Sequence, residues 1–287
     1  MTTSRATAVG LVAVALWSCL ALLTAASGAA PPFLLSALTF AIGGLGGLIA
    51  AAARGRLSAL RQPASVWLVG VGGLFGYHAV YFAALRAAPP EEASLIAFLW
   101  PLLLVLFSAA LPGERLRARH LVGAALAFGG AALLLIGRAG DRALFAGGDW
   151  TGYGLALACA FIWSIYSVVS RLQRRVETEA VAGFCLATAA LSALCHALFE
   201  SPVWPATATQ WAAVIGLGLG PVGVAFYAWD IGVKRGDIRL LGVASYAAPL
   251  ISTLLLVIAG MARPAWSLAW ACLAIAAGAF IAGRRSG

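Results

Sequence analysis

The chain has 287 residues, of which 62% are hydrophobic and only 10% are charged. Soluble domains carry about 25% charged residues, so this composition excludes an ordinary water-soluble fold. Long apolar runs, rather than short alternating strands, predict an all-α polytopic membrane protein. The net charge of +9 is spread over loops without a basic domain, which argues against a nucleic-acid partner and favours contact with membrane lipid.

Apolar runs that end at charges, proline or glycine predict ten membrane-spanning helices. The first five are expected at residues 7–26, 32–53, 66–87, 93–111 and 121–137. The second five are expected at residues 152–169, 180–199, 211–233, 240–261 and 266–282. All but four of the 19 basic residues fall in connections on one side of these spans; the four are Arg86, Arg138, Arg142 and Arg263. Because basic loops are retained in the cytoplasm, both termini are predicted to be cytoplasmic.

The two sets of five spans are related by an internal duplication. Trp17-Ser18 in the first span recurs as Trp163-Ser164 in the sixth. We therefore assign residues 1–140 to a first repeat and residues 141–287 to a second. Five is an odd number of spans, so the second repeat must enter the membrane in the opposite sense. Inverted repeats of this kind are common in transporters, whose substrate sites lie where the halves meet.

Aromatic and polar side chains inside the spans mark the candidate substrate site, because polar groups are costly there and tend to face a cavity or a partner. Tyr77, His78 and Tyr81 share one face of the third span. Three tryptophans lie near the centres of their spans, far from the interfacial belt where tryptophan is common. We expect a central cavity lined by Trp17, Ser18, Tyr77, His78, Tyr81, Trp100, Trp163, Ser164, Tyr166, Tyr227 and Tyr246.

Other residues in the spans have structural interpretations. Pro101 and Pro249 lie inside the fourth and ninth spans, where a missing backbone N–H bends a helix, so we expect them to act as hinges. Asp230 precedes Lys234 by one helical turn, which favours an intrahelical ion pair. Small residues at helical spacing predict close helix packing at residues 43–47, at Gly72 with Gly76, and at Gly216 with Gly220.

Several functional classes are disfavoured. There is no GxxxxGK[ST] loop, which excludes an ATP-driven pump on this chain alone. The five cysteines fall inside spans without a CxxC pair, so we expect no metal site and no cofactor. Two other classes stay open as less favoured alternatives: an intramembrane hydrolase that uses Ser18 or Ser164 with His78, and a receptor that transports nothing. The first lacks a GxSx motif, and the inverted repeat has no evident purpose in the second.

Two motifs recur at matching places in the two halves, and a third follows the fourth span. They are Trp-Ser in the first helix of each half, a mid-span proline in the fourth helix of each half, and Pro112-Gly113-Glu114-Arg115. With these motifs the chain resembles the EamA-type transporters of the drug/metabolite transporter superfamily. Two further segments are similar to those of bacterial amino-acid exporters: Tyr77-His78-xx-Tyr81 and Leu99-Trp100-Pro101-Leu102. The resemblance implies a ten-helix basket around a central cavity, in a bacterial inner membrane, and export from the cytoplasm by alternating access.

The expected lining also indicates the kind of substrate. A cavity of tryptophan, tyrosine, serine and histidine with almost no net charge suits small zwitterions or neutral amphiphiles. Without a buried acid cluster, we expect export of small neutral or aromatic amino acids down their gradient. A drug or other metabolite exporter of the same superfamily, or a proton-coupled exporter, is the alternative. The sequence does not indicate an oligomeric partner.

Overall fold

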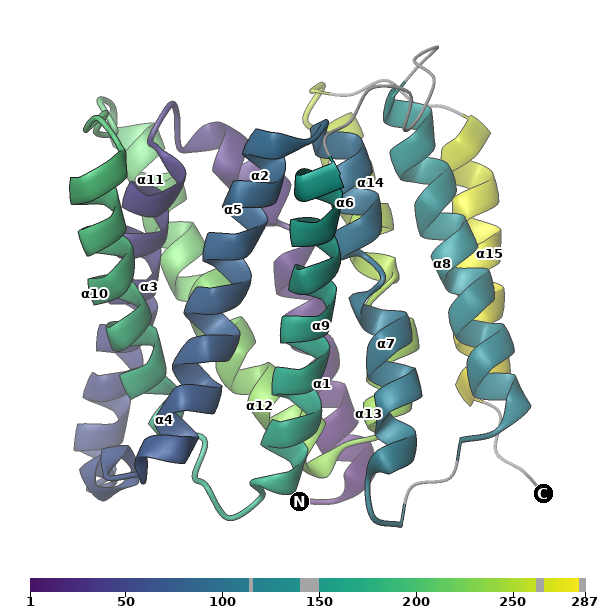
Figure 1. Cartoon of the computed structure of the whole chain (residues 1–287), viewed down its shortest axis with the longest axis horizontal. Coiled ribbons are helices and arrows are strands. Elements are labelled where there is room, and N and C mark those ends of the chain that lie inside the picture. The colour runs from purple at the N-terminus through teal and green to yellow at the C-terminus, as the bar shows by residue number, and fades with distance from the viewer. Residues whose placement is uncertain (114–115, 140–149, 262–265, 284–287) are drawn as a thin grey trace.

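Within the residues that the computed structural model describes, 1–113, 116–139, 150–261 and 266–283, all regular structure is helical (Figure 1). Eight helical segments are long and apolar enough to span a membrane: Thr3–Ala26, Pro32–Ala53, Ala64–Ala87, Pro90–Ala110, Trp150–Leu172, Ala180–Phe199, Ala208–Arg235 and Ile238–Ile258. Two shorter apolar helices, Ala118–Leu133 and Leu268–Ala282, fall on the predicted fifth and tenth spans. The chain is therefore an all-helical, polytopic membrane protein, and the count of ten full spans stays a prediction.

Many of the spans are assembled from shorter helical pieces. The first half contains α1 (Thr3–Trp17), α2 (Leu20–Ala26), α3 (Pro32–Ala53), α4 (Ala64–Val71), α5 (Tyr77–Ala87), α6 (Pro90–Ala97), α7 (Trp100–Phe107) and α8 (Ala118–Ala139). The second half contains α9 (Trp150–Leu172), α10 (Ala180–Phe199), α11 (Ala208–Leu219), α12 (Ala225–Arg235), α13 (Ile238–Ala244), α14 (Ala247–Ile258) and α15 (Trp266–Gly283). Breaks inside a span matter because each one frees backbone groups that lipid cannot satisfy.

Two of the spans contain a π-helical turn at matching positions. The turn η2 (Gly72–Gly76) joins α4 to α5, and η4 (Gly220–Val224) joins α11 to α12. The prediction that Gly72 lies at a close helix contact is wrong, since a Cβ atom there would meet nothing within 4 Å. By contrast, a Cβ on Gly43 would lie 2.8 Å from the Cα of Gly223, so the predicted close packing of α3 is confirmed at this position.

The helices pair in a way that inverted repeats would produce. Side by side in Figure 1, α8 packs along α15 and α3 packs along α10. At the α8–α15 contact, a Cβ on either Gly123 or Gly278 would lie 2.5 Å from the carbonyl oxygen of the other. Likewise α1 packs on α12, and α5 packs on α9. The inverted repeat itself stays a prediction, and its expected boundary between residues 140 and 141 lies outside the described residues.

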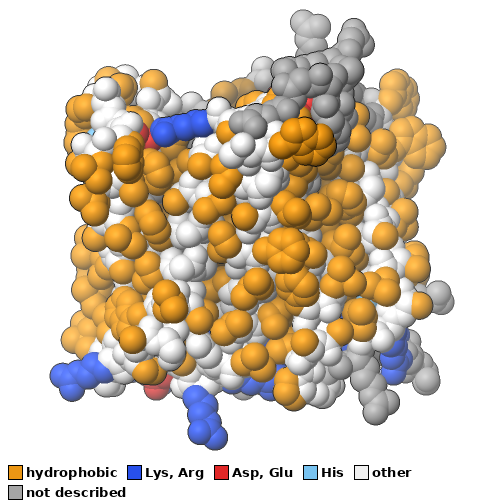
Figure 2. All heavy atoms as spheres, viewed as in Figure 1, with side chains coloured by type: hydrophobic (Ala, Val, Ile, Leu, Met, Phe, Trp, Pro, Cys, Tyr) orange, Lys and Arg blue, Asp and Glu red, His pale blue; other side chains and the backbone are white. Residues whose placement is uncertain are grey.

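One end of the bundle, which we call the terminal end, holds both the start of α1 and the end of α15 (Figure 1). In Figure 2 a broad apolar belt covers the visible face, and most of its basic side chains gather at the terminal end. The cytoplasmic location of this end is a prediction from those charges. Of the four basic residues expected opposite, Arg142 and Arg263 lie outside the described residues, as do Glu114 and Arg115 of the predicted motif.

At the opposite end a buried carboxylate joins three spans. Glu200 follows α10, and its carboxylate accepts hydrogen bonds from the backbone N–H groups of Phe33 and Leu34 at 3.0 and 3.2 Å. It also pairs with Arg86 of α5 at 3.2 Å and with His196 of α10 at 3.0 Å. Glu200 thus caps the N-terminus of α3 while holding α5 and α10 against it.

Replacing this carboxylate should therefore weaken the fold. We expect Glu200→Ala to lower the free energy of unfolding by about 1–3 kcal/mol, because two buried donors lose a charged acceptor. Thermal unfolding of the detergent-purified protein, followed by intrinsic fluorescence, measures the change. Glu177→Ala removes an exposed glutamate and serves as the matched control. Equal unfolding temperatures for the two variants would show that Glu200 is not a structural tie.

Candidate functional site

Four tryptophans from both halves of the chain meet inside the bundle, and we call them the tryptophan cluster: Trp17, Trp100, Trp163 and Trp229. The ring centroid of Trp17 lies 5.1 Å from that of Trp229 and 5.6 Å from that of Trp163. Trp100 meets the other three rings edge to face, the arrangement that the ring quadrupole favours. Trp17 is the one member of the cluster that keeps more than a small part of its surface accessible. The cluster brings α1, α7, α9 and α12 together.

A second group of rings, the α5 face, adjoins this cluster and consists of Tyr77, His78 and Tyr81. The ring of Tyr77 lies 5.4 Å from Trp163 and stacks on Tyr81 at 5.9 Å. His78 meets Phe40 of α3 edge to face at 5.0 Å. All three side chains of the α5 face are only partly buried. The structure therefore brings the predicted residues of the third span into contact with those of the sixth.

Helix breaks and π turns position these rings. Trp17 is the last residue of α1, and its indole N–H donates to the carbonyl oxygen of Pro221 in η4 at 3.1 Å. Ser164 Oγ lies 2.8 Å from the carbonyl oxygen of Trp100, the first residue of α7. In membranes, broken helices persist where side chains satisfy the freed backbone groups. Trp17 of the first Trp-Ser motif thus donates to a carbonyl oxygen on another span. The single hydroxyl hydrogen of Ser164 in the second motif is shared between the carbonyl oxygens of Trp100 and of Ala160 in its own helix, which lies 2.6 Å away.

Tyr166 completes the rings on α9. Its centroid lies 5.2 Å from that of Trp163, and its side chain lies against η2. A Cβ on Gly73 would overlap the Tyr166 ring, so glycine is required at this point of the π turn. Tyr166, like Trp163, is buried. The widened third span therefore makes room for the tyrosine beside the tryptophan cluster.

Trp229 was not among the residues predicted from the sequence. It is fully buried, and its indole N–H donates to Ser167 Oγ at 3.0 Å. Trp229 lies three residues after Phe226, whose ring stacks on Phe40 at 5.4 Å, so both share one face of α12. This aromatic pair at helical spacing was the signal that the sequence offered for Trp229.

His78 offers a hydrogen-bond acceptor to the site. Its Nδ1 lies 2.7 Å from the carbonyl oxygen of Leu74, and a carbonyl can only accept, so Nδ1 carries the proton. In its neutral form the ring then has a lone pair on Nε2. Nε2 makes no hydrogen bond to any part of the chain that the structure describes. Nearby, the hydroxyl groups of Tyr81 and Ser94 lie 2.9 Å apart and are bonded to each other.

Three of the predicted lining residues lie away from this site. The hydroxyl of Tyr227 donates to the carbonyl oxygen of Gly43 at 3.2 Å, in a separate cavity beside α3. Tyr246 is fully buried among residues of α7, α8 and α15, where its hydroxyl accepts from the Leu102 N–H at 3.1 Å. Ser18 is fully buried and bonds within its own helix. We leave these three residues out of the proposed site.

The two predicted hinge prolines follow breaks in their spans. Pro101 lies in the first turn of α7, directly after the gap that separates α6 from α7. Pro249 lies in the first turn of α14, directly after the gap that separates α13 from α14. The fourth and ninth spans therefore change direction at equivalent places, and whether they bend there during function stays a prediction.

A buried ion pair lies below the tryptophan cluster, towards the terminal end. Lys234 Nζ lies 2.8 Å from Asp230 Oδ1, which confirms the predicted intrahelical pair. Thr178 Oγ1 donates to Asp230 Oδ2 at 2.7 Å, and Lys234 Nζ donates to the carbonyl oxygen of Val176 at 2.9 Å. Both charged side chains are nearly inaccessible. The pair therefore fixes the loop between α9 and α10 to α12.

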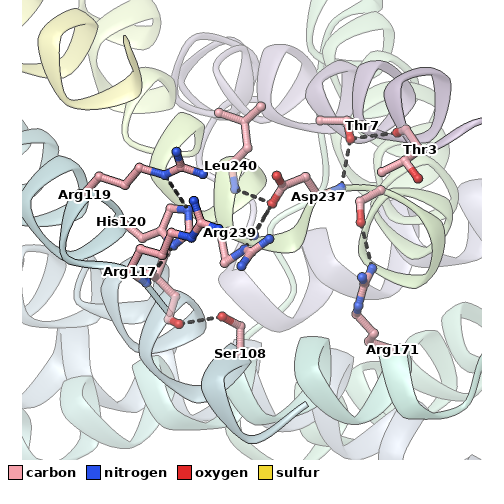
Figure 3. Close-up of polar contacts among 12 residues, drawn as sticks. Thr3, Thr7, Ser108, Arg117, Arg119, His120, Arg171, Asp237, Arg239 and Leu240 are labelled. Carbon is pink, nitrogen blue, oxygen red and sulfur yellow. Dashed lines mark hydrogen bonds and ion pairs between the residues drawn. The ribbon is translucent and has the colours of Figure 1, made fainter. Parts of the chain in front are cut away.

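Further bonds tie the spans at the terminal end. Figure 3 shows Arg171 of α9, Thr7 of α1 and Asp237 of the α12–α13 turn close to one another. Arg171 donates to the carbonyl oxygens of Val233 and Gly236 at 2.9 and 2.7 Å, at the end of α12. The N–H of Asp237 donates to Thr7 Oγ1 at 2.9 Å. A chain of hydrogen bonds thus runs from α9 through the α12–α13 turn to α1.

The two ends of the bundle are packed differently. Near the terminal end, α9 packs on α12 and α7 packs on α13. In an inverted repeat, the α9–α12 pair corresponds to α2 with α5 at the opposite end. The α7–α13 pair corresponds to α14 with α6 at that end. Those pairs make at most marginal contacts. These two helix pairs are therefore in contact at the terminal end, while their counterparts at the opposite end stay apart.

Comparison with known proteins gives consistent matches. The sequence matches the EamA-like transporter family over residues 5–136 and 150–284. It is 62% identical to the aromatic amino acid exporter YddG of Ancylobacter novellus over 98% of both chains, and 27% identical to the exporter of the same name from Salmonella typhimurium, over 89% of this chain and 88% of that one. A probable terminal-alkyne amino-acid exporter of Streptantibioticus cattleyicolor is 26% identical over 76% of this chain and 72% of that one. A crystal structure at 61% identity superimposes with a TM-score of 0.94 and covers 98% of both chains. The chain belongs to the EamA-like transporter family.

Proposed function

We propose that this protein is a secondary transporter that exports small neutral or aromatic amino acids across the bacterial inner membrane. The observation that carries the proposal is the group of aromatic rings from the first, third, fourth, sixth and eighth spans that meets around Trp163. A site shared by both halves is where inverted-repeat transporters hold their substrates. The names of the relatives, which are amino-acid exporters, support the same substrate class.

The proposed site has features that suit an aromatic zwitterion. The faces of Trp17 and Tyr77 border the partly accessible side of the cluster, where they can contact an aromatic side chain or an ammonium group. Nε2 of His78 can accept a hydrogen bond from the ammonium group. The cluster and the α5 face contain no arginine or lysine, which fits a substrate whose own charges cancel. We assign Trp17, Tyr77, His78, Tyr81, Trp100, Trp163, Ser164 and Tyr166 to this site, and add Trp229.

Alternating access is supported by the unequal packing of the two ends. If the terminal end is cytoplasmic, the α9–α12 and α7–α13 contacts close the bundle towards the cytoplasm, while α2 and α5, and α14 and α6, stay apart on the outer side. In the reverse state α2 would close on α5, and the bonds of Arg171 and Thr178 would break. The π turns and the gaps before Pro101 and Pro249 are the places where the spans can bend with least loss of hydrogen bonds.

Contacts in the structure weigh against the other candidates. Ser18 and Ser164 bond to backbone carbonyl oxygens rather than to His78, so neither is placed as the nucleophile of a hydrolase. Asp230 is paired with Lys234, and no acidic side chain joins His78 in a hydrogen bond among the described residues, which disfavours a proton relay. We therefore propose a facilitator, with a drug or other metabolite exporter of the same family as the alternative.

Export from proteoliposomes tests this proposal. The purified protein should release preloaded, labelled tryptophan or phenylalanine down its gradient with no imposed ion or pH gradient. Unlabelled aromatic amino acids should compete, and dicarboxylates should not. Release that requires a proton or sodium gradient would contradict the facilitator mechanism. The absence of any amino-acid flux would contradict the substrate class.

His78→Ala should slow export by about tenfold or more, because a hydrogen bond to a charged group contributes about 1.5–3 kcal/mol. His196→Ala is the matched control, since it removes a histidine that lies at the far end of α10 and bonds to Glu200. The control should keep export while lowering the unfolding temperature. Both variants are measured in the proteoliposome assay at equal protein content. Normal export by His78→Ala would remove this residue from the site.

A further inference from the structure

A cavity of about 410 Å³ lies outside the tryptophan cluster between α1, α3 and α12. The α3 helix touches η4 at Gly43 and Gly223, and side chains of α12 reach α3 at Phe40 and Gly43, but the backbones of α3 and α12 stay apart. The two helices therefore separate towards the terminal end and leave a groove between them. Its volume lies in the range of sites that hold small molecules or cofactors, about 300–1,000 Å³.

The walls of this groove are apolar, and one side is open to the membrane. Gly46, Gly47 and Ala50 form the α3 wall, and Val224 and Ile231 are on the opposite wall. Val224 is 55% exposed, so the groove is reached from the side of the bundle. The hydroxyl of Tyr227, which also lines it, is bonded to a backbone carbonyl oxygen. Such walls suit an alkyl chain.

The terminal end of the groove carries an excess of positive charge. Arg54 lines the groove there and is 67% exposed at its side chain. Arg54 and Arg56 share a single carboxylate, that of Glu179, at 4.0 and 3.4 Å. Arg5 is exposed and lies one turn from the groove residue Val9 on the same face of α1. Arginines at the membrane surface attract anionic lipid headgroups.

We propose that this groove binds one anionic phospholipid, with an acyl chain between α3 and α12 and the phosphate at Arg54. The shape, the apolar walls, the lateral opening and the positive end together match this occupant. The α12 helix also carries Phe226 and Trp229, whose rings belong to the aromatic centre. A lipid in the groove would therefore brace α12 against α3. The proposal is independent of which substrate is transported.

Native mass spectrometry of the detergent-purified protein tests this site. The protein is incubated with equal amounts of dioleoylphosphatidylglycerol and dioleoylphosphatidylcholine. Wild type should retain one phosphatidylglycerol in preference to phosphatidylcholine. Gly46→Trp should abolish that retention, because a Cβ at Gly46 meets no atom within 4 Å and the ring can enter the groove. Ile49→Trp, on an exposed face of α3 that does not line the groove, should retain the lipid as wild type does.

A surface substitution makes the test independent of whether the tryptophan variant folds. Arg54→Gln should lower the preference for phosphatidylglycerol about fivefold, since one surface arginine contributes about that factor to binding of an anionic lipid. Retention without any headgroup preference would overturn the proposal. So would the same retention by wild type and Gly46→Trp, or an unchanged preference in Arg54→Gln.

Discussion

The structure depends on one constraint: a helix that breaks inside a membrane must find partners for its freed backbone groups. Here those partners are the polar atoms of aromatic and hydroxyl side chains. The indole N–H of Trp17 bonds to the carbonyl oxygen of Pro221 in η4, and the N–H of Leu102 in the first turn of α7 donates to the hydroxyl of Tyr246. Because each contact joins one half of the chain to the other, the breaks also hold the two halves together.

These hydrogen bonds use only polar atoms of the side chains, so the faces of the aromatic rings at the centre of the bundle stay available for contact with other groups. The rings of Trp17 and Tyr77 are held in place by neighbouring rings, and His78 has its Nδ1 proton committed to the backbone. The site is therefore rigid, aromatic and uncharged, with an acceptor on one wall. Around it, the bonds of Arg171 and the Asp230–Lys234 pair close only the terminal end. A fixed site with one closed end is what a transporter needs.

Much of this could be predicted from the sequence because span positions follow from hydropathy, and the Asp230–Lys234 pair follows from helical spacing. The differences between the predictions and the structure have physical reasons. Tyr227 and Tyr246 were placed in the site because they lie in the right spans, but sequence position does not tell which face of a broken helix turns inward. The π turns rotate the segments that follow them about the helix axis. Gly72 and Gly76 would predict packing in a regular helix, but here they mark the place where the side chains begin to point in a different direction. Trp229 was missed for the same reason, because its face depends on η4.

A structure of the protein with bound L-tryptophan tests directly whether the substrate site lies at the tryptophan cluster and the α5 face. We expect the amino acid to lie against Trp163, with its ammonium group within hydrogen-bond distance of His78 Nε2. The rings of the tryptophan cluster should keep their backbone contacts in that complex. Binding of the amino acid in the groove beside Tyr227, away from His78, would contradict the assignment of the substrate site to the tryptophan cluster and the α5 face.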